Sequence, residues 1–259
     1  MKKLKVAFIG GTGMKSFVEF ESFTRVGTPY GPSPLISFGK LVGVEVAFLP
    51  RHGELHEFPP HMVNYRANIW ALRSLGVERI LATSATGAIN PDYNVGDIAI
   101  LKDFLDFTAV RPRTFYDKAP VTHVDFSDPF CPELREALIN AAGKKKQKIW
   151  KDTVYVCMEG PRYETPAEIE MLRSLGGDLV GMTVVSEAVL ARELEMCYAC
   201  LSFVSNMAAG MQKRITSDEV AEVSRKMMPK IQEVLEETVR NIPKRRSCSC
   251  SYTLEGARL

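Results

Sequence analysis

The sequence predicts a single α/β domain built on a central mixed β-sheet flanked by helices. Two observations favour this class: strand-like apolar runs alternate with helix-like patterns, and polar small-residue turns follow several of the strands. The chain has 259 residues, of which 46% are hydrophobic and 25% charged, which suits one domain with a sizeable core. We expect this domain over residues 1–243, followed by a polar C-terminal tail over 244–259.

Local patterns predict the elements in chain order. Thr165 and Thr216 each precede a glutamate by three residues, and this spacing indicates a capping box at the start of a helix. Segment 103–132 is rich in proline, aspartate and aromatic residues, and we expect an ordered excursion near a site. The expected strands are 6–9, 35–38, 44–49, 79–83, 97–101, 153–158, 179–182 and 197–205; the expected helices are 63–75, 132–142, 165–175, 186–193 and 217–240.

The charge balance excludes some classes of partner. Lysine and arginine number 33 against 31 acidic residues, so the net charge of +2 gives no electrostatic reason to expect nucleic acid or membrane partners. No apolar run reaches the ~18 residues that a membrane span needs. The basic start is followed by a short apolar run and a glycine-rich turn, which indicates a first strand and not a signal peptide. We therefore expect a cytoplasmic protein.

The six cysteines fall into different settings. Cys197 and Cys200 lie in an expected strand, where residues three apart point to opposite faces, so this pair should be core and should share neither a bond nor a metal. Cys248 and Cys250 lie in the polar tail, where we expect them to be exposed and able to form a strained, easily reduced disulfide. Cys131, like Cys157, has no partner visible in the sequence.

Hydroxyl and cationic side chains gather after several strands. Because ligands bind at the carboxyl ends of strands in α/β sheets, we expect these side chains to share one site. None of the candidate donors is acidic, which points to an anion site without metal, although each turn taken singly is more often a plain turn. The donors are Thr12, Arg51, His52, Ser84 and Thr183. Arginine in particular presents a fork that fits phosphate.

Two further patterns concern metal and base recognition. His52 and His56 have the spacing of a zinc helix, but Gly53 stands where a metalloprotease needs glutamate and two prolines follow, so metal binding is disfavoured. Glu164 and Asn206 supply a carboxylate and a carboxamide near the ends of two elements, a pair suited to reading the edge of a heterocycle. Taken alone, the first residue is equally a helix N-terminal acid and the second a turn former.

The motifs that carry these residues resemble, in type and order, those of the trimeric purine nucleoside phosphorylases and methylthioadenosine phosphorylases. The resemblance runs from about residue 6 to about 239, and its overall pattern is most similar to the methylthioadenosine branch. The motifs are IGGTG at 9–13, RHGELH at 51–56, HMVNYRANIWAL at 61–72, SATGA at 84–88, EGPRYETPAE at 159–168 and GMTVVSEAVLARE at 181–193.

The resemblance implies roles for individual positions. Met182 would lie against the ribose, Tyr163 would border base and sugar, and Glu164 and Asn206 would meet the purine. The family implies no metal and no organic cofactor, with inorganic phosphate as co-substrate. It also implies a homo-oligomer, a trimer or a dimer of trimers, in which a neighbour's loop closes each site; His123 and Phe130 lie in the segment that would supply it. The implied phosphate contacts are Thr12, Arg51, His52, Ser84, Ala85 and Thr183.

The base pocket and the branch resemblance point to different substrates. Adenine-type members carry aspartate at the positions of Asn206 and Ala208 and a small hydroxyl residue at that of Glu164, whereas the Glu–Asn pair is similar to 6-oxopurine enzymes. Since function is argued from the site, we expect phosphorolysis of inosine and guanosine, a purine salvage reaction. The alternative is action on methylthioinosine or methylthioadenosine. Ser217 does not distinguish these substrates. It lies where ordinary nucleoside enzymes tend to have histidine and methylthio enzymes an apolar residue, and serine is neither.

The sequence disfavours two other protein classes. A protein that merely binds or senses nucleosides would have no need of the anion donors. A nicotinamide dehydrogenase would need a third glycine in the turn after the first strand, and this turn lacks it.

Overall fold

The computed structural model describes residues 5–11 and 18–259. Within them the helices are α1 Tyr65–Ser74, α2 Pro132–Lys144, α3 Pro166–Ser174, α4 Val184–Glu193 and α5 Ser217–Asn241, with the short 3₁₀ helices η2 Pro60–Met62 and η3 Ser249–Tyr252. The strands are β1 Val6–Gly10, β2 Glu19–Thr24, β3 Gly27–Thr28, β4 Gly31–Pro32, β5 Ile36–Leu41, β6 Val44–Pro50, β7 Arg79–Ala88, β8 Ile98–Phe107, β9 Ile149–Met158, β10 Leu179–Gly181 and β11 Cys197–Met207. None of the described helices combines the length and hydropathy of a membrane crossing.

The described strands form one large mixed sheet, as expected. Nine of them pair in the order β10-β9-β8-β11-β7-β1-β6-β5-β2, and β10 also pairs with β7, so five strands close on themselves at one end. Strands β6, β1, β7 and β11 run parallel to one another, while β5 and β2 form an antiparallel edge. The parallel strands bring their carboxyl ends to one edge of the sheet.

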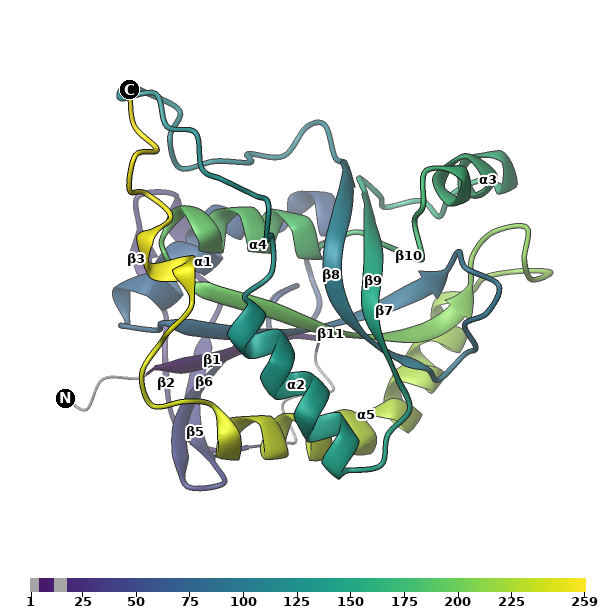
Figure 1. Ribbon diagram of the computed structural model, residues 1–259, viewed down its shortest axis with the longest axis horizontal. Helices are drawn as coiled ribbons and strands as arrows, with labels where there is room; N and C mark the ends of the chain where they lie inside the picture. Colours follow the sequence, from purple (N-terminus) through teal and green to yellow (C-terminus); the bar gives the residue numbers. More distant parts are fainter. Residues whose placement is uncertain (1–4, 12–17) are drawn as a thin grey trace.

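Helices cover both faces of this sheet (Figure 1). Successive residues of β1 alternate between the two layers, as the strand period requires: Ala7 and Ile9 pack in the core with α1 and α4, while Val6 and Phe8 pack with α2 and α5. Residues Cys197 and Cys200 of β11 follow the same rule and enter opposite cores, which confirms that they do not face each other.

Helix starts follow the capping signals. Thr165 accepts a hydrogen bond from the Glu168 amide, and the Glu168 carboxylate accepts one from the Thr165 amide, so the expected capping box opens α3. At α5 only half of the expected box forms. Thr216 accepts from the Glu219 amide, but the Glu219 carboxylate instead accepts from Gln212 Nε2 at 2.9 Å.

Several strands extend beyond their expected ends. Residues 84–88 were expected to be a turn but continue β7, because Ser84 and Ala85 pair with Ser202 and Phe203 of β11. Asn206 likewise lies within β11 and not after it, next to a register shift between Val204 and Asn206. Such an irregularity redirects a side chain, and it stands beside the site.

The tail does not match the expectation of an exposed segment. Cys248 and Cys250 are buried, with 8% and 2% of their surface exposed. The chain before them is fixed to the domain, because Arg246 donates to the Glu195 carbonyl at 2.7 Å and the Ser247 amide donates to Glu133 Oε2 at 2.9 Å. Its last residues run beside segment 108–131, with the Leu259 amide donating to the Val121 carbonyl (Figure 1).

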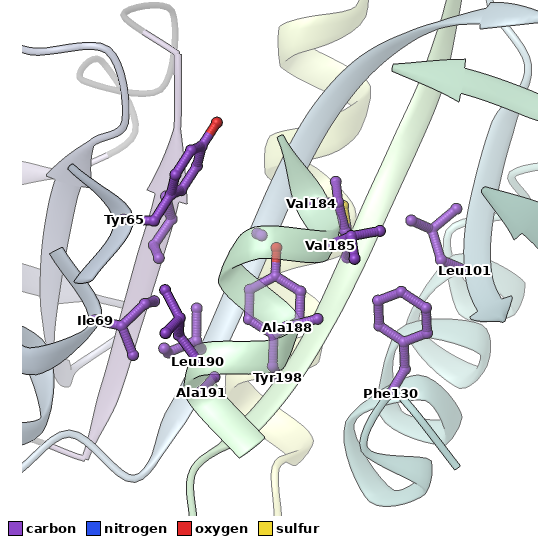
Figure 2. Close-up of a cluster of buried hydrophobic side chains, with 14 of the residues drawn as sticks. Tyr65, Ile69, Leu101, Phe130, Val184, Val185, Ala188, Leu190, Ala191 and Tyr198 are labelled. Atoms are coloured by element: carbon purple, nitrogen blue, oxygen red, sulfur yellow. The ribbon is translucent and has the colours of Figure 1, made fainter. Parts of the chain in front are cut away.

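The excursion expected over 103–132 is shorter in the structure and covers 108–131, because β8 runs to Phe107 and α2 begins at Pro132. The expected loop that would close a neighbour's site is not fully available. Phe130 packs inside its own chain near Leu101 and Tyr198, with 2% of its surface exposed (Figure 2). Phe130 therefore cannot reach the site of a neighbouring subunit. His123 is exposed, and its amide donates to the Ala257 carbonyl of the tail.

Candidate active site

A cavity of about 960 Å³ opens at the edge where the parallel strands end. This is where α/β sheets bind ligands, and the volume lies within the range of small-molecule sites. Thr12 lies outside the described residues. All the other predicted site residues line the cavity: Arg51, His52, Ser84, Ala85, Tyr163, Glu164, Met182, Thr183, Asn206, Ala208 and Ser217.

Strand pairing brings these distant residues together. Gly87 of β7 pairs with Val180 of β10 on one side and Asn206 of β11 on the other. Because β10 runs antiparallel to β7, the residues after Val180 return along β7, which brings Thr183 toward Ser84. A Cβ at Gly87 would lie 3.1 Å from Asn206 Nδ2 and 3.2 Å from Val180 Cγ1, so any side chain there would press on both residues.

A buried arginine forms one end of the cavity. Arg51, 4% exposed, donates from Nε and Nη2 to the carboxylate of Glu187 and from Nη1 to the Thr83 carbonyl at 2.9 Å. Burial alone would lower the pKa of Arg51, but the charge of Glu187 outweighs it and raises that pKa. These bonds use three of the five N–H groups of the guanidinium. Glu187 is not itself an anion donor, but it holds the cation of this donor set in place.

His52 is a neutral ring at pH 7. Burial, and then the charge of Arg51, lower the pKa of His52 to about 4. Its Nδ1 lies 2.8 Å from the Phe58 carbonyl, which can only accept, so Nδ1 carries the proton and Nε2 has a lone pair. His52 was expected as a donor, but in this state its Nε2 accepts, and a protonated phosphate oxygen would donate to it.

The start of helix α4 adds hydroxyl and backbone groups to the same end. Thr183 is the N-cap residue, yet its side chain makes no capping bond, and its amide donates to Tyr155 Oη at 3.3 Å. Ser84 lies on the neighbouring strand with its hydroxyl 3.3 Å from the Ala85 carbonyl. A helix N-terminus favours an anion through its dipole and its unpaired amides. Together with Arg51, this end of the cavity is suited to an anion.

A carboxylate without a partner forms another part of the wall. Glu164 is 8% exposed, and its buried Oε1 has no hydrogen-bond partner among the described residues. Desolvation raises the pKa of Glu164. An unpaired buried carboxylate oxygen is costly to the fold, so a ligand that donates a hydrogen bond would relieve it.

Asn206 presents a donor beside it in the same cavity. Its Nδ2 donates to the Met207 carbonyl at 2.9 Å, and its Oδ1 lies 2.7 Å from Ser205 Oγ. A carbonyl can only accept, so this contact fixes which end of the amide is nitrogen. The second N–H of the same nitrogen suits an acceptor on a ligand. Glu164 and Asn206 thus supply one acceptor and one donor.

Helix α5 forms a wall that sequence reasoning noticed only at Ser217. Its first turns also contribute Val220 and Ala221, and Met228 follows two turns later. The signal was the helical spacing of these residues with Ser217, but they read equally well as core positions. The wall is mixed, because Ser224 and Arg225 also line the cavity beside these apolar side chains.

Two supporting residues were missed. Glu187 lies within GMTVVSEAVLARE, yet nothing local shows that it meets Arg51. Arg111, 5% exposed, donates to the carbonyls of Met182 and Glu159 and to the Glu159 carboxylate, so it joins the ends of β9 and β10 below the cavity. Its one possible signal, the burial of an arginine in a loop, is visible only in the structure.

The neighbouring histidines do not form a metal centre of three or more ligands. The His52 and His56 rings are 4.5 Å apart. Over residues 5–11 and 18–259, the group of closely spaced histidine, cysteine and acidic side chains that could hold a metal consists of cysteines elsewhere.

Known proteins share this architecture. Residues 5–240 match the Phosphorylase superfamily. A Pyrococcus furiosus protein named 6-oxopurine nucleoside phosphorylase is 50% identical over 262 residues, and a Methanopyrus kandleri protein named probable S-methyl-5'-thioinosine phosphorylase is 51% identical over 255, each with 98% of both chains covered. The solved structure of methylthioadenosine phosphorylase from Schistosoma mansoni in complex with adenine has a TM-score of 0.92 at 32% identity and covers 99% of both chains. The chain therefore belongs to the phosphorylase superfamily, among its nucleoside phosphorylases.

Proposed function

We propose that this chain catalyses the phosphate-dependent cleavage of 6-oxopurine nucleosides, inosine and guanosine, to the free base and ribose 1-phosphate. The observation that carries the proposal is the buried Oε1 of Glu164, which has no partner among the described residues. A 6-oxopurine presents N1–H as a donor, and guanine adds a 2-amino donor. Either group would satisfy the carboxylate, and Asn206 would donate to O6 or N7 of the same base.

Adenine presents the reverse pattern. Its N1 accepts and its 6-amino group donates, so the ionised Glu164 carboxylate would face a lone pair. Leaving a buried charged group unpaired in this way is costly, and sites built on such hydrogen bonds reject the mismatched base by up to about 10⁴-fold. We therefore infer that adenosine is a poor substrate.

The reaction needs positioning and charge stabilisation more than it needs acid–base groups. A phosphate oxygen forms a bond to C1′ while the C1′–N9 bond breaks. The electron pair of the broken C1′–N9 bond leaves with the purine, which then takes up a proton. Arg51, Thr183 and the amides at the start of α4 would hold the phosphate, and Asn206 would stabilise charge on the leaving base. Preorganised donors of this kind act on the oxocarbenium-like transition state.

The apolar side chains of the mixed α5 wall favour a second candidate. Val220, Ala221 and Met228 line the cavity beside Ser217, and such a surface suits a methylthio group better than a 5′-hydroxyl. S-methyl-5′-thioinosine combines that group with a 6-oxopurine base, so it is compatible with Glu164 and Asn206. The relative from Methanopyrus kandleri carries the name of this activity. Methylthioadenosine would satisfy the wall but not the base pocket.

One experiment separates these substrates. The full chain is incubated with inosine, guanosine, adenosine, methylthioinosine and methylthioadenosine, with and without phosphate, and release of the base is followed. Phosphate-dependent release from inosine or guanosine supports the proposal. A kcat/KM that is highest for methylthioinosine moves the assignment to the second candidate, and a preference for adenosine or methylthioadenosine rejects the base-pocket argument. Base release independent of phosphate would reject phosphorolysis.

We further propose that the pocket needs phosphate as co-substrate but no metal and no organic cofactor. Its candidate ligand groups are an arginine, hydroxyls and amides, which bind anions directly. Initial rates should therefore be unchanged by added Mg²⁺, Mn²⁺ or Zn²⁺ at low concentration, and a rate that requires one of these ions would contradict this.

A further inference from the structure

Four cysteine sulfurs from three distant parts of the chain meet at one buried point. Cys131 precedes helix α2, Cys197 begins strand β11, and Cys248 and Cys250 belong to the tail. Their Sγ atoms all lie within 4.8 Å of one another. All four residues are buried, with exposed fractions from 0% to 8%. None of the four lines the cavity of the candidate active site. The tail cysteines also lie beyond residues 5–240, the part that matches the superfamily.

The spacing is that of a tetrahedral thiolate site. Zinc–sulfur bonds of about 2.3 Å in a tetrahedron place neighbouring sulfurs about 3.8 Å apart. The Cys197 and Cys248 sulfurs are separated by 3.4 Å, and no other pair in the group exceeds 4.8 Å. A change of about 1 Å or less in each sulfur–sulfur distance would therefore allow one ion to bind at the centre.

Two neighbouring groups support sulfur ligands at this point. Cys131 is the N-cap residue of α2, and its Sγ accepts a hydrogen bond from the Leu134 amide at 3.5 Å, the kind of support that orients a metal ligand. Arg246 also lies against the group. Its guanidinium stays protonated in proteins, so a positive charge lies beside Cys197.

The tail is held in place independently of the sulfurs. The Ser247 amide and hydroxyl both donate to Glu133 Oε2 at 2.9 Å, and the other oxygen of Glu133 accepts from Arg79 at 3.0 Å. Arg246 donates to the Glu195 carbonyl. Two ligands from the tail are therefore presented on a fixed backbone to two ligands from the domain.

We propose that Cys131, Cys197, Cys248 and Cys250 bind one zinc ion in a closed structural site that fastens the C-terminal tail to the domain. Binding replaces up to four S–H protons, which pass to solvent, with four sulfur–zinc bonds, and Arg246 offsets part of the negative charge that results. All four positions of the ion are filled by protein sulfurs, so the site supplies stability and not catalysis.

The first test is metal content. The full chain is produced with zinc present and purified anaerobically under reducing conditions, and zinc per chain is measured by elemental analysis. We expect about one zinc per chain in the wild type, and at least about tenfold less in Cys248→Ser after the same dialysis, because one of four thiolates is lost. Cys157→Ser is the matched control: it removes a buried cysteine outside the group and should keep its zinc.

The second test needs no variant and so does not depend on a variant folding. Cobalt(II) is exchanged into the reduced wild-type chain, and four thiolates should produce intense visible d–d bands together with sulfur-to-cobalt charge-transfer absorption. Thermal unfolding should shift to lower temperature when a strong chelator removes the ion, and zinc should restore it. Equal zinc content in wild type and Cys248→Ser, a cobalt spectrum without thiolate bands, or two sulfur–sulfur bonds among these cysteines in the anaerobically purified chain would each overturn the proposal.

Discussion

Glu187 on α4 holds the guanidinium of Arg51, a residue 136 positions earlier, through hydrogen bonds from both Nε and Nη2, and the side chains are 1% and 4% exposed. Tyr198 donates a further bond to the same carboxylate at 2.7 Å. Breaking one partner of a buried pair leaves an uncompensated charge, whereas replacing both can be nearly neutral. The pair therefore has two separable roles: it orients a cation at the anion end of the cavity, and its integrity affects the stability of the fold.

A double substitution separates these roles. Arg51→Met alone should lower kcat/KM by about 10²–10³-fold and raise the KM for phosphate, because a preorganised donor is lost. It should also cost about 3–5 kcal/mol of unfolding free energy, because Glu187 is left buried and unpaired. Adding Glu187→Gln should recover most of the stability but none of the activity. Denaturant unfolding and phosphate-saturation kinetics on the wild type and the two variants provide the check, and near-normal phosphorolysis by Arg51→Met would remove this residue from the phosphate site.

His52 should make stability depend on pH. Its pKa is about 4 in the folded chain and about 6.5 when unfolded, so between these values the unfolded chain binds the extra proton. The contribution of His52 is fully present above pH 6.5 and is lost as the pH falls toward 4. Phosphate beside the ring would favour its protonated form and so reduce this loss. Melting temperatures measured from pH 7 to 4.5, with and without phosphate, should show both effects, and His52→Gln should flatten the difference; an unchanged profile in that variant contradicts the assignment.

Local chemistry explains which parts of the fold could be predicted. The Thr165 capping box and the strand spacing of Cys197 and Cys200 depend on residues a few positions apart, and both are confirmed. Residues 84–88 have turn-like composition, yet they extend β7 because β11 supplies a partner more than a hundred residues later. Pairing over that distance is set by the packed sheet and leaves no local pattern.

The same limit applies to the site. The predicted residues other than Thr12 collect around one cavity because most of them lie at or just beyond the ends of strands that reach the same edge. Glu187 was not predicted, because its role depends on its contact with Arg51, which is distant in the sequence. The tail was expected to be exposed because its composition is polar, but its contacts with Glu133, Cys131 and Cys197 are not visible from its own sequence.

Exposed apolar side chains next to the cavity predict assembly. Leu55 and Met62 are 84% and 62% exposed in the segment that follows Arg51, and Val110 is 77% exposed in segment 108–131. Such surface is typical of an interface, and the resemblance implies a trimer or a dimer of trimers. Light scattering should find a homo-oligomer, and Leu55→Lys should weaken it and lower activity, while Val44→Lys, a change at a 37% exposed position on the β5–β6 hairpin, should alter neither. An active wild-type monomer would contradict this.

Glu164 should lower the stability of the free protein. Within residues 5–11 and 18–259 its buried Oε1 has no partner, and desolvation raises its pKa, so above that pKa the ionised group opposes folding. Glu164→Gln should therefore raise the melting temperature of the ligand-free protein at pH 8, and this gain should shrink as the pH falls through the pKa of the carboxyl group. A lower melting temperature in Glu164→Gln at every pH would show that the carboxylate has a partner after all.

The same residue, together with Asn206, should decide base choice. Glu164→Gln replaces a charged acceptor and should lower kcat/KM for inosine by about 10–10²-fold. Asn206→Asp removes the donor for O6 or N7, so it should weaken 6-oxopurine use and improve the relative rate with adenosine. In the wild type, acidification should also raise the adenosine-to-inosine ratio, because a protonated Glu164 can donate to N1 of adenine. Ratios of kcat/KM for the two nucleosides at pH 8 and pH 5.5 measure all three effects. A selectivity that none of these changes moves would mean that the base is recognised by other residues.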